Sequence, residues 1–449
     1  MKMLRTFTLL ATLAAAATLP AAPDSTPSVP DRLDLPTALR FAHENNFTIR
    51  QARERLNQAE GALMTARAGL LPHASVDSSY SRTSRQITTE TQDDELWSAT
   101  AGVTQTVYAG GAVSAGARAA RASRDAAQFE LQATTNQVLA GVRIGFYSVL
   151  RAQETIKVRE QSLALLEEEL KNARNRYEAG AGAQFDVLRA EVALANGRPP
   201  LITARNDLKI AIEELRELLG FTNREGGNLD KVPEFVGELS ISQEQFALAE
   251  VLEASRRDRP ELQALAKGIN IAQSGVTVAR AGYLPTVGVS AGWEIVGNRA
   301  RYHSLTGHSN YDGWYLGAQS SWAIFDGRAT AGRVRSAKSQ LNQARLSLQQ
   351  QELAIDVDVR RAFATWQEAV ELVTASGKVV DQATEALRLS RARFDVGAAT
   401  QLDVLQAQVA LTEAGNNKVQ ALYAYNAALA QLRLAIGQRE PELPGAMTR

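Results

Sequence analysis

The sequence predicts a mainly α-helical protein that carries a membrane β-barrel and is built from two internal structural repeats. Three observations predict this fold class. One motif occurs twice, 217 residues apart. A helical run of about 65 residues without proline precedes each copy. Each helical run follows two segments in which apolar and small polar residues alternate. Because two halves related by one period usually form one architecture, we expect the 449 residues to fold as a single two-repeat unit.

Bulk composition argues against several functional classes. Lys+Arg and Asp+Glu both number 49, and this zero net charge gives no support for a nucleic-acid-binding surface. The absence of cysteine excludes disulfides and thiolate metal sites, and only 4 histidines remain for any other metal centre. The sequence has no Gly-x-Ser-x-Gly motif, phosphate-binding loop or metal-spaced histidine set. We therefore expect neither enzymatic activity nor a cofactor.

The first 22 residues are typical of a secretory signal peptide. Lys2 and Arg5 supply its positive end, and residues 7–19 supply an alanine-rich apolar core that is too short to span a bilayer. After it, no uninterrupted apolar run reaches the roughly 18 residues that a membrane-spanning helix needs. If the protein crosses a membrane, it therefore does so with strands.

The two repeats begin in the same way. Residues 24–34 form a loose polar leader, and residues 35–68 have a helical pattern with a break near Asn45 and Asn46. The words Ala-Arg-Ala-Gly-x-Leu-Pro close this helix at 66–72 and occur again at 279–285, because glycine and then proline end a helix and start an extended segment. The expected organisation is a signal peptide at 1–22, a first repeat at 23–220, a connector at 221–250 with short strands near Phe235 and Val236, a second repeat at 251–437 and a C-terminal tail at 438–449.

Two alternating segments follow each helix, within residues 73–108 and 286–325. Runs of about ten residues with one apolar face and one small polar face are what a membrane barrel needs. Four of the five tryptophans lie here and are expected to form an aromatic girdle at the lipid headgroups: Trp97, Trp293, Trp314 and Trp322. The alternative is a soluble β-sandwich with buried tryptophans, but the uniformly small polar opposite face favours the membrane.

Each strand pair leads into a long helical hairpin, at 110–220 and 327–437. The outgoing helices, near 112–177 and 329–394, would each be a rod about 100 Å long at 1.5 Å per residue. Their apolar stripes must meet other helices in a coiled coil. The return helices are about half as long, so the helix that precedes the strands could complete the rod by stacking end to end. Pro199 and Pro200 are expected to break or kink the first return helix.

Four strands in one chain cannot close a barrel, and an open edge in lipid leaves backbone groups unpaired. Two copies would give eight strands, three would give twelve and four would give sixteen; twelve or more leave a lumen. A pore prolonged by such rods would be an export conduit. The alternative is a non-conducting periplasmic coiled-coil scaffold or adaptor protein, which would not need four alternating strands marked by tryptophan.

The hairpin tips carry the repeated motif. It reads Arg-Tyr-x-x-Gly at 176–180 and Arg-Phe-x-x-Gly at 393–397, followed by Asp-Val-Leu at 186–188 and 403–405. Together with the repeated Ala-Arg-Ala-Gly-x-Leu-Pro words, this motif resembles the TolC family of outer-membrane efflux proteins over nearly all the mature chain. Glycine permits the reversal at each tip, and an acid in the first turn suits a helix N-terminus.

The resemblance implies a homotrimer in which a twelve-stranded β-barrel in outer-membrane lipid continues into a twelve-helix α-barrel in the periplasm of a Gram-negative bacterium, with a belt near residues 221–250. It also implies that the protein is the exit duct of a tripartite efflux or type I secretion system. The tips would dock to a periplasmic adaptor (membrane fusion) protein that serves an inner-membrane pump, and would open as the gate. The exported substrate and the class of pump stay open.

By resemblance, Asp403 lies at the family's constriction, and Asp186 and Phe394 lie in its tip-locking network. The family's tyrosine and arginine in the second tip are replaced here by Phe394 and Ala399. We therefore expect Arg393 or Arg176 to hold the closed state. The expected adaptor-docking residues are Tyr177, Gly180, Val187, Leu188, Gly397, Val404 and Leu405. The alternative is structural: Asp186 and Asp403 as helix N-terminal acids, with Thr400 as a cap, and Gly180 and Gly397 as turn formers.

Overall fold

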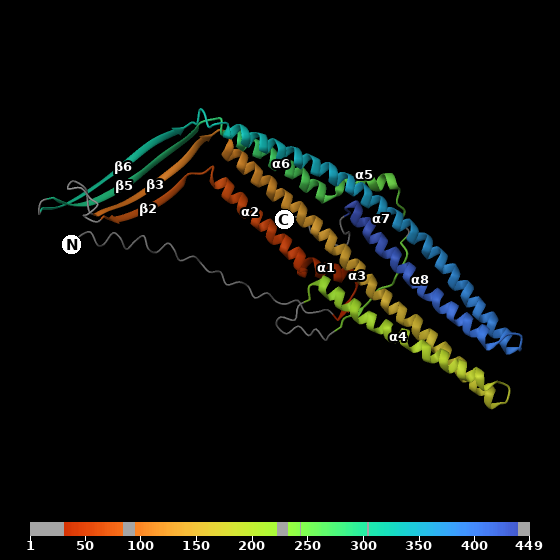
Figure 1. The fold of residues 1–449 in the computed structure, drawn as a ribbon. Helices are drawn as coiled ribbons and strands as arrows, with labels where there is room; N and C mark the ends of the chain where they lie inside the picture. The colour runs from red at the N-terminus through yellow and green to blue at the C-terminus, as the bar shows by residue number, and fades with distance from the viewer. Residues whose placement is uncertain (1–30, 84–94, 222–231, 243, 303–304, 439–449) are drawn as a thin grey trace.

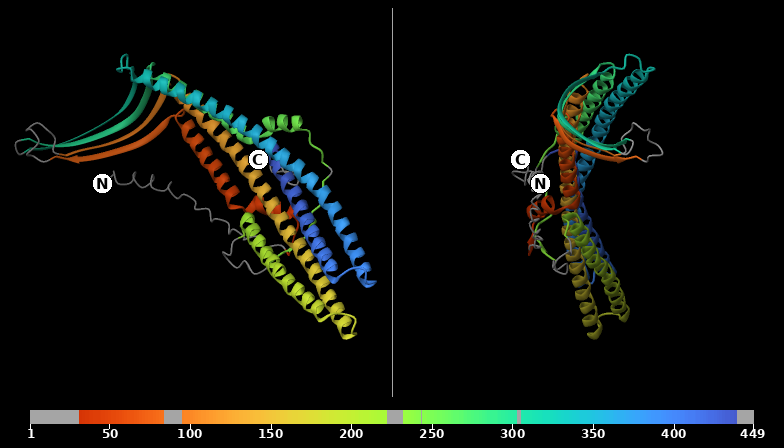
Figure 2. Two further views of the ribbon diagram at one scale, coloured as in Figure 1. Left: turned by 45° about the vertical axis from the view of Figure 1, so that its right-hand side comes forward. Right: turned by 90° about the vertical axis from the view of Figure 1, so that its left-hand side faces the viewer.

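The computed structural model describes residues 31–83, 95–221, 232–242, 244–302 and 305–438, without the side chains of residues 299–309. The expected signal peptide and residues 439–449 of the expected tail lie outside the described residues. The molecule is elongated: a curved sheet occupies one end, parallel helices extend from it, and two hairpin tips lie at the far end (Figures 1 and 2).

A four-stranded antiparallel sheet forms the strand end, in the order β2 (His73–Arg82), β3 (Glu95–Ala109), β5 (Thr286–Tyr302) and β6 (Leu305–Ser321). The expected alternating segments are therefore strands. The last of them ends earlier than expected, so Trp322 and Ile324 lie beyond β6. The chain leaves the sheet there and turns through Gly327 and Arg328, whose positive φ angles of 65° and 73° are incompatible with a continuing strand.

Two rods run the length of the helical part. The helices α3 (Ala112–Glu178) and α7 (Ala329–Asp395) each have 67 residues, and the return helices α4 (Gln184–Leu219) and α8 (Gln401–Ile436) each have 36. The expected long hairpins are confirmed.

The expected break in α4 is wrong, because the helix is continuous through Pro199 and Pro200. These prolines remove the donors to the carbonyls of Ala195 and Asn196, and both of those residues are exposed, so water can satisfy the carbonyls. Buried Leu201 and Ala204 on the same helix hold it in place by packing. Tertiary packing therefore overrides the local preference.

Shorter helices complete the rods. The chain forms α1 (Leu35–Asn45) and α2 (Phe47–Ala68), with the expected break at Asn46, and later α5 (Leu248–Asp258) and α6 (Pro260–Ala281). The expected stacking is confirmed: α2 and α4 lie end to end along α3, and α6 and α8 likewise meet (Figure 1). Asn46 Nδ2 donates to the Leu218 carbonyl at 2.6 Å, and Arg259 Nε donates to the Ala435 carbonyl at 2.8 Å.

A two-stranded parallel sheet joins the expected leader to the connector. Its strands are β1 (Arg32–Leu33) and β4 (Glu234–Phe235). The connector strand at Phe235 was expected, whereas the leader was expected to be loose at this point. Leu33 corrects that prediction: it is fully buried, and it packs with Phe235 and Phe146 in a core between α1, α3 and α4. Apolar burial of this kind orders a segment whose sequence is otherwise polar.

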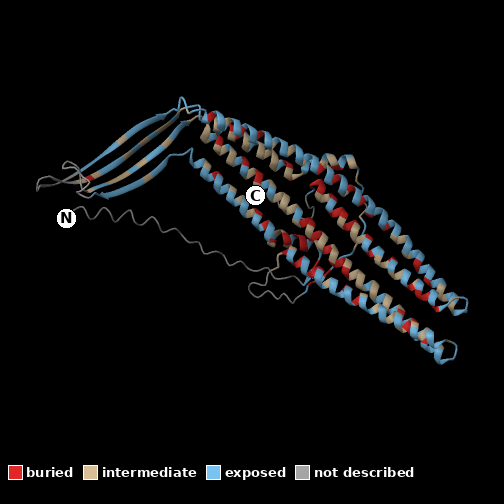
Figure 3. Ribbon diagram, in the orientation of Figure 1, coloured by how far each residue is buried: buried red, intermediate tan, exposed pale blue. Residues whose placement is uncertain are grey.

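The buried residues lie along the helices, whereas the sheet is mostly exposed (Figure 3). A second large core joins α5, α7 and α8 around Ile355, Trp366 and Tyr425. Within the described residues, no helix is both long enough and apolar enough to cross a membrane.

Candidate functional site

One face of the sheet is apolar across all four strands. The register aligns Val76, Ala101, Trp293 and Trp314 in one row, because each is the cross-strand partner of the next. The exposed fraction of Trp314 is 75%. None of the described residues covers this face, and an exposed apolar face of this kind marks a membrane or a partner interface.

The tryptophans lie at three levels of the sheet. Trp97 pairs with Tyr80 towards the end of the sheet far from the helices, and Trp293 and Trp314 pair in the middle. Trp322 lies at the helical end, where its Nε1 donates to the Tyr283 carbonyl at 3.1 Å. An aromatic girdle therefore stays a prediction for Trp97 and Trp322, which lie at the two outer levels. Trp293 and Trp314 lie in the middle of their strands, away from the levels expected for headgroups.

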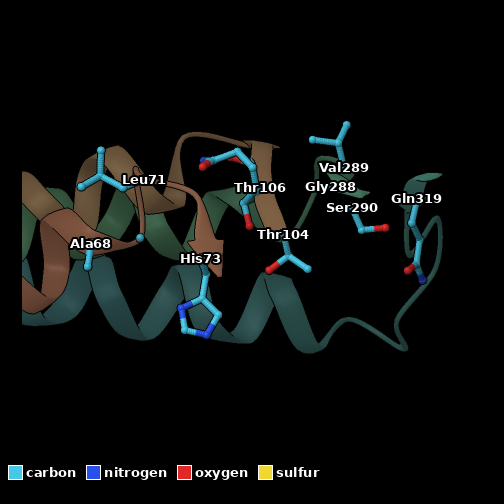
Figure 4. A pocket seen from close by; sticks show the side chains of 11 residues that line it. Ala68, Leu71, His73, Thr104, Thr106, Gly288, Val289, Ser290 and Gln319 are labelled. Atoms are coloured by element: carbon cyan, nitrogen blue, oxygen red, sulfur yellow. The ribbon is translucent and has the colours of Figure 1, made fainter. Parts of the chain in front are cut away.

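The opposite face is small and polar. Asp77, Thr100 and Glu294 lie in one row of it, and Gly102 and Gly292 leave room for the ring of a tyrosine on β6. Near the helices this face and the end of α2 enclose a hollow of about 470 Å³. Figure 4 shows its hydroxyl, amide and imidazole groups, from His73, Thr104, Thr106, Ser290 and Gln319. A face of this chemistry suits contact with water.

Both tips fold as the same turn. Gly180 and Gly397 have φ angles of 73° and 76°, which side chains with a Cβ rarely adopt. The amide of Ala181 donates to the Arg176 carbonyl at 2.8 Å, and the amide of Ala398 donates to the Arg393 carbonyl at 2.7 Å. The turn-forming role expected for the two glycines is confirmed.

Ionic contacts near the tips join the two hairpins. Arg176 Nη2 donates to Asp395 Oδ1 at 2.9 Å, and the Arg176 guanidinium lies 4.3 Å from the centre of the Phe394 ring. Arg391 of α7 reaches Glu168 of α3 at 3.3 Å. The structure thus brings together two of the expected gate residues, Arg176 and Phe394.

Asp395 was missed by sequence reasoning, although a signal was present. It is an acid in the last turn of α7, where the helix dipole disfavours negative charge, so a cationic partner stabilises it. Arg393 is the other arginine expected to hold the closed state. Its contact stays within its own tip, where its Nη2 donates to the Ala398 carbonyl at 3.4 Å.

Asp403 is part of a capping box at the start of α8. Its Oδ2 accepts from the Thr400 amide and hydroxyl, both at 2.8 Å, and its own amide donates to Thr400 Oγ1 at 3.3 Å. The Thr400 amide and then its hydroxyl hold the pKa of the Asp403 carboxyl below its ordinary value, and Arg393 lowers that pKa further. The capping alternative is confirmed for Asp403, and Asp186 lies at the matching place in the first turn of α4.

The expected docking residues differ in exposure between the two hairpins. Tyr177 and Leu188 are about half exposed, whereas Val404 and Leu405 are buried. The cause is the position of the helices: α8 packs against both α7 and α3, whereas α4 packs against α3 and, near its end, α1. Of these apolar side chains, the exposed surface therefore lies on the first hairpin.

Two exposed apolar stripes follow the outer helices, and their members are three, four, seven or ten residues apart, which are all sums of the three- and four-residue steps of a coiled coil. We call them the α4 stripe (Phe185, Leu188, Val192 and Ile202) and the α7 stripe (Leu372, Val379, Leu389 and Val396). Among the described residues the lower helices pack in the order α4, α3, α8, α7, so both stripes lie at free edges of this layer. Apolar stripes of this kind are typical of helices that pack against other helices.

Comparison with known proteins agrees with this architecture. A family model described as "Outer membrane efflux protein" matches residues 38–221 and 251–438. The outer membrane protein TolC of Vibrio cholerae is 25% identical over 396 residues, which are 88% of this chain and 89% of that protein. The cobalt-zinc-cadmium resistance protein CzcC of Cupriavidus metallidurans is 27% identical over 391 residues, 85% of this chain and 84% of that protein.

The solved open state of the MtrE outer membrane channel of Neisseria gonorrhoeae has the same fold, with a TM-score of 0.72 at 20% identity over 90% of this chain and 89% of that chain. The family match covers both helical hairpins and both strand pairs. This chain is therefore an outer-membrane protein of a Gram-negative bacterium, and it belongs to the outer membrane efflux protein family, the TolC family that its repeated motifs resemble.

Proposed function

We propose that this chain forms a homotrimeric channel-tunnel, the exit duct of a tripartite efflux or type I secretion system, gated at its periplasmic tips. One observation carries the proposal. Both ends of the elongated molecule present groups that lack partners within the described residues. The sheet has two edge strands with unpaired backbone groups, and the helical end has the exposed α4 and α7 stripes.

The sheet supports closure by identical copies. β2 and β6 are its edge strands among the described residues, and each presents backbone groups that cost several kcal/mol per group if left unpaired in lipid. Pairing β6 of one copy with β2 of the next closes twelve strands in a trimer, a size that leaves a lumen. The small polar face would then line water and the apolar face would meet lipid.

The levels of the tryptophans fit a bilayer. Trp97 pairs with Gly297, and Trp322 follows Ser321, the partner of Thr286. At about 3.3 Å per residue these levels lie roughly 40 Å apart along the strands. A strand tilt near 40° reduces this to about 30 Å of height, the thickness of the hydrocarbon core.

The helices support the same symmetry. With α4 at one edge of the layer and α7 at the other, the α4 stripe of one copy would pack on the α7 stripe of the next. Three copies then form a ring of twelve helices that continues the barrel. Arg176, Asp395 and Phe394 would hold the hairpins together in the closed gate, and the exposed Tyr177 and Leu188 would meet the hairpin of a periplasmic adaptor. The pump behind that adaptor would select the substrate.

Reconstitution tests the proposal. The chain has no cysteine, so Leu188→Cys combined with Leu389→Cys introduces the only thiols, each eight residues from its tip glycine. Oxidation should link neighbouring copies into covalent trimers, and the detergent-extracted protein should conduct ions in planar bilayers. The matched control pairs Leu188→Cys with Ala383→Cys, whose side chain is buried on α7 and should not cross-link. A protein that washes off membranes with salt and never conducts would refute the proposal.

A further inference from the structure

A buried polar cluster lies where the second hairpin packs on the first. Glu169 of α3 is 4% exposed, and Gln401 and Gln408 of α8 are 3% and 2% exposed. Glu169 Oε1 and both amide atoms of each glutamine are buried without a hydrogen-bond partner. We call these three residues the polar seam. Each buried polar atom without a partner lowers the stability of this helix contact.

The polar seam differs from the rest of the same rod. Further from the tips, α3 buries Val142, Phe146 and Val149 in an apolar core. Closer to the tips the α3–α8 contact also includes polar side chains, beginning at Ser162 and Thr412, whose hydroxyl oxygens lie 2.9 Å apart. An apolar residue at position 169 would pack more stably, so the carboxyl there calls for a functional explanation.

Neighbouring groups shift the pKa of Glu169 in both directions. Burial raises the pKa of its carboxyl; contact with Gln401 and the charges of Arg391 and Arg176 lower that pKa, and Glu168 raises it. Arg391 and Arg176 are already engaged, the first by Glu168 and the second by an aspartate of the second tip.

The other helices packed around Glu169 bring charges that are also paired. On the α4 side, Glu191 is bound by Arg174 of α3 at 2.6 Å. On α8, Asp403 is held in its capping box by Thr400. Each of the charges named here is therefore already engaged by another group.

We propose that protonation of Glu169 controls how firmly α8 packs against α3 near the tips. With its proton, the carboxyl can donate a hydrogen bond to the side-chain amide oxygen of Gln401, which otherwise has no partner. Without its proton, it places a negative charge in a largely buried site. The packed hairpins hold the proton more tightly than separated, hydrated hairpins do. Lower pH therefore favours packing, and packing weakens as the pH rises through the raised pKa.

Amide hydrogen exchange of the full-length protein tests this directly. We would compare residues 404–412 of α8 at pH 5.5 and pH 8, correcting for the intrinsic exchange rate; this window lies above the range in which Asp403 titrates. We expect corrected exchange at least threefold faster at pH 8 in the wild type, and no such change in Glu169→Gln, which is neutral at both pH values. Glu167→Gln, an exposed acid on the same helix, is the matched control and should behave like the wild type.

The possible results distinguish this inference from the proposed function. The inference about packing does not need the channel, and only its consequence for gating rests on the proposed function. A wild type whose corrected exchange is equal at both pH values overturns the inference, even if the protein conducts. Persistence of the pH effect in Glu169→Gln also overturns it. If the exchange results are as expected but no current is observed in bilayers, the proposed channel fails and the proton-dependent packing stands. If both hold, the open probability should rise with pH in the wild type and stay constant in Glu169→Gln.

Discussion

Replacing Arg176 with glutamine should open the gate, because this side chain makes two contacts between the hairpins. Its ion pair with Asp395 joins side chains that are 38% and 69% exposed, and such pairs contribute about 0.5–1 kcal/mol. Its position over the Phe394 ring contributes about 0.5–1 kcal/mol more. The sum, about 1–2 kcal/mol, corresponds to a 5- to 30-fold change in the ratio of open to closed tips.

Single-channel recording in planar bilayers measures that ratio as open probability. Arg174→Gln is the matched control, because Arg174 binds Glu191 across α3 and α4, within the first hairpin. It removes a similar exposed ion pair and the same charge without touching the second hairpin, so it should leave the open probability unchanged.

A double-mutant cycle isolates the pair itself. Asp395→Asn alone should raise the open probability, and adding it to Arg176→Gln should raise it by less than the product of the two single effects. Equal effects of Arg176→Gln and Arg174→Gln would refute the reasoning, since they would show that charge near the tip, and not a contact between hairpins, controls opening.

Three further predictions concern stability. Gly220→Ala, whose Cβ would lie 2.7 Å from the Asn45 carbonyl oxygen at a φ of 78°, should lower the thermal midpoint more than Gly180→Ala, which has a similar φ and open space; equal losses would contradict this. In the wild type, exchange protection in the first turn of α8 should fall as pH falls through the lowered pKa of Asp403. Thr400→Val removes the hydroxyl donor but keeps the backbone amide that contributes most, so it should weaken this pH dependence without abolishing it; an unchanged pH dependence would contradict this. Phe146→Ala should cost about 3–5 kcal/mol, measured as faster unfolding in denaturant, and an unchanged rate would contradict this.

Local sequence patterns were sufficient for most of the architecture. Proline-free runs predicted α3 and α7 to within a residue or two, because helix formation over such a length depends on propensity and on one apolar stripe. Alternation predicted the strands for a similar reason, since the faces of a strand follow from a period of two. The tip glycines were predicted because their left-handed backbone restricts the choice of residue.

Features that depend on distant packing were not predicted. Pro199 stays within a helix because α3 supports α4, and Leu33 is ordered by a core that assembles from four separate elements. The polar seam was missed because nothing near Glu169 in the sequence shows that α8 will cover it. Val404 and Leu405 match Val187 and Leu188 in the repeat, yet a second neighbouring helix buries them. The repeat therefore predicts the backbone conformation of a residue more reliably than the burial of its side chain.

The equal lengths of α3 and α7 limit how the proposed tunnel can evolve. One inserted residue would advance a tip by about 1.5 Å and rotate it by roughly a quarter of a circle, so that Arg176 and Asp395 would no longer face each other. A viable change of reach must add or remove whole heptads in both rods, and in the helices stacked beside them, at the same time. If the proposed channel-tunnel forms, its reach into the periplasm is therefore adjustable only in coarse steps of about 10 Å.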